Sequence, residues 1–110
     1  MDDACLNFRL TPEERGRFDQ QGFLVVPDVL DVATVERLIH AVDGLTDRWR
    51  PVYERDRGLK SHHPLNVLDF IGQHDDFLPL IDLPQTFMKV VDILGWHIQL
   101  YHSHMIVTPP

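Results

Sequence analysis

The sequence predicts an α+β fold, because amphipathic helical patterns alternate with short apolar strands. The longest helical pattern runs from about Val32 to Trp49, with apolar residues at three- and four-residue steps. An apolar run at 23–26 and a period-two pattern at 96–107 each predict a strand. The chain has 110 residues, of which 44% are hydrophobic and 25% charged, so we expect one globular domain or part of one.

The first predicted elements have clear boundaries. The string Thr-Pro-Glu-Glu at 11–14 is typical of a capping box with proline at the first helical position, and it opens a short helix that we expect to end at Gly22. The apolar run 23–26 then predicts a buried strand. Pro27 ends this strand, because proline removes a donor from the hydrogen-bond ladder.

The rest of the chain alternates between helical and extended patterns. Asp31 is the expected N-cap of the long helix, and the polar stretch 50–64, which contains three helix breakers, predicts a long surface loop. The apolar segment 66–70 fits a strand or a helix. A brief helical turn is expected to end at Ile81, and a longer helix is expected over 84–94 with a glycine stop.

Charge and composition restrict the partners of the chain. Ten Lys and Arg against seventeen Asp and Glu give a net charge of −7, which argues against nucleic acid and membranes as partners. The acidic start, Met1-Asp2-Asp3, differs from a secretion signal, and no apolar run approaches the roughly 20 residues that span a bilayer. We therefore expect a cytoplasmic protein. Its single cysteine, Cys5, should lie in a frayed terminus, form no disulfide and not act as a nucleophile.

Several short strings then occur in a particular order. A first helix is followed by Gly-Phe-Leu-Val-Val-Pro-Asp-Val-Leu at 22–30 and by the long amphipathic helix. Asp-Leu-Pro at 82–84 opens a helix that ends in Ile-Leu-Gly, and the strand Ile-Gln-Leu-Tyr-His-Ser-His follows at 98–104. This order, from about Thr11 to Pro110, resembles the N-terminal portion of the phytanoyl-CoA dioxygenase family.

The resemblance implies an Fe(II)- and 2-oxoglutarate-dependent dioxygenase (a hydroxylase) on a double-stranded β-helix, which is a cupin-like jelly roll. In that family a His-x-Asp pair and a distant His hold the iron, and an Arg binds the 2-oxoglutarate carboxylate. These residues follow the matched strand, so residues 1–110 would be the N-terminal part of one domain: a helical support layer plus the first strands of an incomplete jelly roll. We expect the chain alone to be inactive, without catalytic residues and without bound Fe(II) or 2-oxoglutarate. The intact enzyme would take a small-molecule substrate.

His102 and His104 are the candidate pocket residues. Residues two apart on a strand share a face, so both imidazoles could contact one metal or one ligand. In the layout of the family this face borders the active-site cavity, which implies contacts with co-substrate or substrate. The alternative is two half-exposed strand histidines without a role. If the histidines face inward, Ile98, Leu100 and Ile106 face inward with them.

His74 and Asp76 are a weaker candidate, because the string at 74–76 is itself a His-x-Asp. The metal interpretation would add His102 or His104 as a third ligand. The plain alternative is a capping carboxylate beside a solvated imidazole, and the family's own pair would lie beyond Val107. His62 and His63, in the polar loop, receive no role.

Three functions therefore remain open: a dioxygenase fragment, a stand-alone acidic interaction module, and a small metal-binding protein that uses the His and Asp candidates. The predicted strand at 96–107 is followed at once by Thr-Pro-Pro, and folds usually cover unpaired strand edges. We therefore expect the polypeptide to continue, and the isolated chain to self-associate through an exposed sheet edge.

Overall fold

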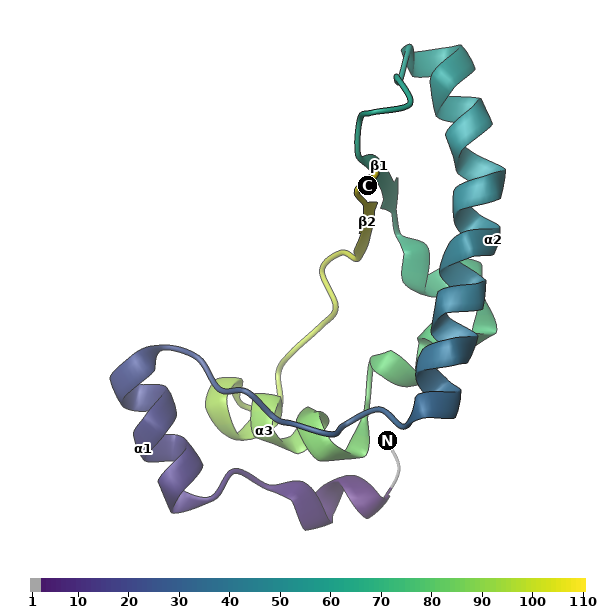
Figure 1. Cartoon of the computed structure of the whole chain (residues 1–110). Helices are drawn as coiled ribbons and strands as arrows, with labels where there is room; N and C mark the ends of the chain where they lie inside the picture. The colour runs from purple at the N-terminus through teal and green to yellow at the C-terminus, as the bar shows by residue number, and fades with distance from the viewer. Residues whose placement is uncertain (1–2) are drawn as a thin grey trace. The chain divides into compact units, whose positions relative to one another are not determined.

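The computed structural model describes residues 3–110, which form two compact units (Figure 1). The first unit contains the N-terminal segment through Asp31 together with residues 79–99, and the second contains residues 32–78 and 100–110. The architecture is α+β, as predicted, with helices and one small antiparallel sheet. None of the helices in the described part of the chain combines the length and the apolar character that crossing a membrane requires.

The first unit consists mainly of three helical elements. They are the 3-10 helix η1 (Asp3–Phe8), α1 (Pro12–Gln21) and α3 (Pro84–Leu94). The predicted capping box of α1 is confirmed, because Thr11 Oγ1 accepts the Glu14 N–H at 3.2 Å and a Glu14 carboxylate oxygen accepts the Thr11 N–H at 2.9 Å. The helix ends, as predicted, at Gly22, whose left-handed φ of 79° is accessible to glycine without steric cost.

The core of the first unit lies between η1 and α3. Cys5, Met88 and Val91 are buried together there. The expectation that Cys5 lies in a frayed terminus is therefore wrong: the residue is fully buried, and its thiol donates to the Asp82 carbonyl at 3.6 Å. The helix η1 has only six residues, which is too short for a periodic pattern to be recognised in the sequence. The partner of Cys5 is 77 positions away, so no local string could indicate the contact.

Two ion pairs attach the N-terminal segment to α3. Lys89 Nζ lies 2.6 Å from a Glu14 carboxylate oxygen and also donates to the Arg9 carbonyl at 3.3 Å. Arg9 pairs with Asp92, which also accepts the Leu10 N–H at 2.9 Å. Both carboxylates are thus held by cations and by backbone donors, which joins α1 and the preceding segment to one helix from much later in the chain.

The second unit contains one long helix and one two-stranded sheet. The helix α2 runs over Val32–Arg57, and the strands are β1 (Leu65–Leu68) and β2 (His104–Val107). The strands pair antiparallel, with Leu65 opposite Val107 and Leu68 opposite His104. Two 3-10 helices, η2 (Phe70–Gln73) and η3 (Asp75–Leu80), follow β1 along the chain.

The two faces of this sheet have different environments. The helix α2 contacts β1, and Figure 1 shows the two side by side. Leu65, Val67 and Met105 are buried, with at most 7% of each residue exposed. The alternating residues Leu68 and Ile106 are 47% and 63% exposed. Within the described residues, the sheet therefore has one face covered by α2 and one open face.

Two predicted strand assignments are wrong. Residues 23–26 are extended but unpaired, with Phe23 and Val25 59% and 70% exposed. In the predicted strand 96–107, only His104–Val107 pairs in the sheet, whereas 96–103 lies outside any strand and has a bend at Trp96. The reason is the same in both places: an apolar or alternating pattern predicts extended backbone, whereas a strand also needs a partner.

The predicted surface loop at 50–64 is wrong in its first half, because α2 continues through Pro51 to Arg57. Proline removes one backbone hydrogen bond from a helix, and side-chain contacts lie on both sides of Pro51 along the last turns of α2. The Arg57 guanidinium lies 4.2 Å from the centre of the Tyr53 ring, and the Trp49 indole donates to the Gln73 side chain at 2.6 Å. The ambiguous segment 66–70 is resolved as the end of β1 followed by the start of η2.

Candidate functional site

His102 and His104 lie side by side at the start of β2. Their ring centroids are 4.7 Å apart, and the ring planes are tilted by 45°. The Tyr101 ring packs edge-on against His102 with a centroid distance of 4.8 Å. Both histidines are exposed. The two imidazoles thus form a pair on one side of the chain, open to a ligand.

The histidine pair is on the uncovered side of the second unit. His104 alternates along β2 with the buried Met105 and shares the open face with Ile106. The inward orientation of Leu100 and Ile106 is predicted only for the case in which the histidines face inward. The histidines are exposed here, and Leu100 and Ile106 are exposed with them, each at least 60%. Ile98, the third member of that set, packs instead on the core of the first unit.

Two polar residues that the sequence did not single out make hydrogen bonds around this segment and the neighbouring η2. Between the histidines, the Ser103 carbonyl accepts the Asp69 N–H at 2.7 Å, and its hydroxyl accepts the Ile71 N–H at 3.3 Å. The Gln73 amide donates to the Leu68 carbonyl at 3.0 Å while its oxygen accepts the Trp49 indole N–H. The contacts of Gln73 with Trp49 and of Ser103 with Ile71 connect residues 24 and 32 positions apart, so no local motif could have revealed them.

His74 and Asp76 are close but engaged locally. His74 Nδ1 lies 3.6 Å from an Asp76 carboxylate oxygen and accepts the Asp76 N–H at 3.2 Å. The other carboxylate oxygen lies 3.7 Å from Arg37 Nε. Among residues 3–110, no group of three His, Cys, Asp or Glu side chains is close enough to hold a metal ion. The interpretation in which His74 and Asp76 share a metal with a third histidine therefore does not match this geometry.

His62 and His63 form another close pair, in the turn that follows α2. Their ring centroids are 4.4 Å apart. His63 Nδ1 accepts the Lys60 N–H at 3.2 Å, and the His63 N–H donates to the Lys60 carbonyl at 2.9 Å. One ring nitrogen of this pair is therefore part of the turn itself.

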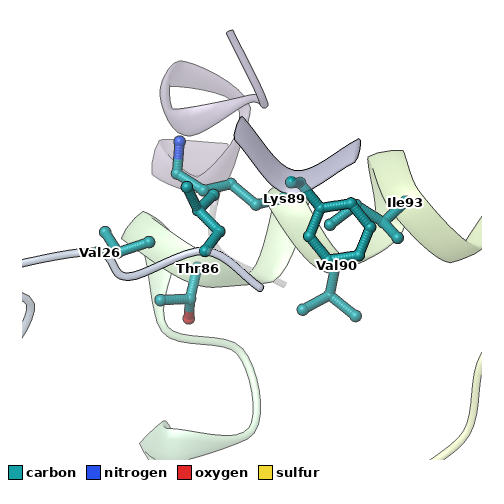
Figure 2. A pocket seen from close by; sticks show the side chains of 7 residues that line it. Val26, Thr86, Lys89, Val90 and Ile93 are labelled. Atoms are coloured by element: carbon teal, nitrogen blue, oxygen red, sulfur yellow. The ribbon is translucent and has the colours of Figure 1, made fainter. Parts of the chain in front are cut away.

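A small cavity of about 190 Å³ lies in the first unit, between α3 and the extended segment before α2 (Figure 2). Its lining is mostly apolar: Phe18, Leu24, Val26, Thr86, Lys89, Val90 and Ile93. The two polar members are engaged elsewhere, because the Thr86 hydroxyl donates to the Leu83 carbonyl at 3.3 Å and Lys89 pairs with Glu14. The cavity therefore offers shape and apolar surface, but no group suited to acid–base or nucleophilic chemistry.

Comparison of the chain with protein-family models, with curated proteins and with solved structures gave no match. The family resemblance thus depends on the strings at 22–30, 82–84 and 98–104 alone.

Proposed function

We propose that this chain is the N-terminal part of a phytanoyl-CoA dioxygenase-like domain, an Fe(II)- and 2-oxoglutarate-dependent hydroxylase with a jelly-roll fold. The two-sided sheet is the observation that best supports this proposal. A jelly roll packs two sheets face to face, so each sheet needs one face turned to its partner sheet and one turned outward. Here α2 covers the face of Leu65, Val67 and Met105, and the opposite face is open.

In this proposal the open face lines the ligand cavity, with His102 and His104 at its border. Exposed imidazoles can donate to a carboxylate or accept from a hydroxyl, so they suit a polar co-substrate or substrate. Ser103 and Gln73 act as positioning residues. Ser103 connects the histidine segment to η2, and Gln73 connects η2 to β1 and α2. Leu68 and Ile106, on the same face, provide apolar surface for the second sheet.

Iron does not fit the residues described here. The family's site needs two histidines and one carboxylate around one point, and residues 3–110 bring no three such side chains together. The proposal therefore requires the His-x-Asp pair, the distant His and the Arg for 2-oxoglutarate to follow Pro110 in the full protein.

A longer protein, encoded by the DNA that follows the Pro110 codon, tests this function. We expect a His-x-Asp within about 10 to 25 residues, a usual span for a long connection, with a further His and an Arg later. The longer protein should bind Fe(II) in a 2-oxoglutarate-dependent manner under anaerobic calorimetry. In it, His102→Ala should weaken 2-oxoglutarate or substrate binding and leave iron binding in place.

The same extension should change the association state. A sheet of two strands has two free edges and little independent stability, so we expect the 110-residue chain to associate as its concentration rises. The extended protein should sediment as one species over the same range, because added strands cover those edges. If the downstream DNA encodes no such ligands in any frame, the dioxygenase proposal is wrong. A monomeric 110-residue chain with a sharp thermal transition would then favour the interaction module.

A further inference from the structure

We infer that His102 and His104 form a two-imidazole site for one late first-row divalent ion, with Zn(II) as the representative. This site is a property of the 110-residue chain and is separate from the iron centre proposed above, although the proposed function places the same two imidazoles at the border of the ligand cavity. It does not depend on any residue beyond Pro110. The two histidines are neighbours on the open side of the second unit, and both are exposed. An ion could therefore reach them without any rearrangement of the core.

The spacing of the rings suits a shared metal. Residues two apart on an extended chain are about 6.6 Å apart along the backbone. The ring centroids of His102 and His104 are only 4.7 Å apart, so the side chains converge. Two imidazoles bound to one tetrahedral zinc, with zinc–nitrogen distances near 2.0–2.1 Å, have ring centroids about 5 Å apart. The observed separation is thus close to that of a bound pair.

The ring nitrogens of this pair are also available. Within residues 3–110, neither imidazole takes part in any of the hydrogen bonds found, and their contacts are ring packing with each other and with Tyr101. The residue opposite His104 in the sheet is Leu68, which offers no competing donor or acceptor. Water completes the coordination in such an open site, because the described chain brings no third His, Cys, Asp or Glu to it.

The donor set determines the class of ion. Neutral imidazole suits zinc, copper and nickel, whereas carboxylate and carbonyl oxygens suit magnesium and calcium. Affinities of one nitrogen site rise from manganese through iron and cobalt to nickel and copper. Zn(II) and Ni(II) should therefore bind this pair more tightly than Fe(II), and Mg(II) should not compete.

His62 and His63 provide a matched control within the same chain. Their rings are as close, with a centroid distance of 4.4 Å, and they are also exposed. They differ in that His63 Nδ1 already accepts a backbone N–H from Lys60. If close imidazoles alone were enough, zinc would bind at either histidine pair. The inferred site instead uses only His102 and His104, whose ring nitrogens make no hydrogen bond within the described residues, and not His62 and His63.

Zinc titration of the tag-free chain, followed by calorimetry, tests the inference. We expect one saturable event per chain. His102→Ala and His104→Ala should each weaken zinc binding by about tenfold or more. Loss of a residue that only supports a metal ligand lowers metal affinity about 10–100-fold, and loss of the ligand itself should cost at least as much. The double variant His62→Ala/His63→Ala should bind as the unmodified chain does. In NMR spectra of the unmodified chain, the imidazole signals of His102 and His104 should shift together with zinc.

Three results would overturn the inference: no saturable zinc binding, unchanged affinity in His102→Ala, or loss of binding in the His62/His63 variant. Both candidate ligands are exposed, so the alanine variants should fold, and the NMR titration needs no substitution at all. The titration uses the chain without its proposed extension. A missing zinc site and a missing downstream iron triad are therefore distinguishable results.

Discussion

Leu65→Ala is expected to destabilise the second unit by about 2–5 kcal/mol, the usual cost of truncating a buried leucine. Leu65 is completely buried, on the sheet face that α2 covers. The substitution removes apolar surface from the core and leaves a cavity that neighbouring side chains refill only in part. Urea unfolding followed by circular dichroism measures the effect, as a lower midpoint at unchanged slope.

Leu68→Ala is the matched control, because it makes the same chemical change three positions along the same strand. Leu68 lies on the open face and is 47% exposed, so its loss should cost about 1 kcal/mol or less. Equal losses in the two variants would mean that both sheet faces are covered, which would contradict the two-sided sheet on which the proposed function depends. If Leu65→Ala does not fold, Leu65→Val tests the same difference with a smaller change.

Lys89→Met is expected to cost the first unit about 1–3 kcal/mol, the desolvation penalty of a buried polar group left without its partner. The Lys89 and Glu14 side chains are only 10% and 17% exposed, and their charged atoms lie 2.6 Å apart. The methionine keeps most of the apolar stem but leaves the Glu14 carboxylate without its cation. Thermal and urea unfolding of the variant measure the loss.

Arg55→Met is the control for removing a cation. Arg55 pairs with Asp56 at 2.6 Å, but these side chains are 73% and 51% exposed. Exposed pairs of this kind contribute about 0–1 kcal/mol. The double variant Glu14→Gln/Lys89→Met should recover part of the stability lost in Lys89→Met, because the unpaired charge is removed. If Lys89→Met is as stable as Arg55→Met, burial of the Lys89–Glu14 pair is not important for stability.

Acidification is expected to weaken the first unit. The hydrogen bond from Lys89 and then that from the Thr11 N–H hold the pKa of Glu14 below its ordinary value, and the hydrogen bond from Arg9 does the same to the pKa of Asp92. A carboxyl whose pKa is lowered on folding contributes stability above its unfolded pKa, near 4, and loses that contribution as the pH falls through the folded value. Stability should therefore be level above about pH 5 and decline below it. The decline should be shallower in Asp92→Asn, and an unchanged profile would contradict this account.

Local signals of the sequence predicted the boundaries of α1 and α3, but not the end of α2 at Arg57 or the presence of η1. The capping box at 11–14, the glycine stop at Gly22 and the helix over 84–94 are all present. Each depends on residues within one or two turns of each other, so the information is contained in a short string. The proximity of His102 and His104 could be predicted for the same reason, since an extended backbone brings residues two apart to one side.

Short strings were enough to predict where most helices begin and which side chains two residues apart lie on one side of the chain. The pairing of the two strands, the covered side of β2 and the burial of Cys5 depend instead on tertiary contacts. The physical reason is that alternation tells which residues share a face but not which face another element covers. That choice depends on contacts between distant segments, such as α2 on β1 and η1 on α3, and no short pattern encodes them.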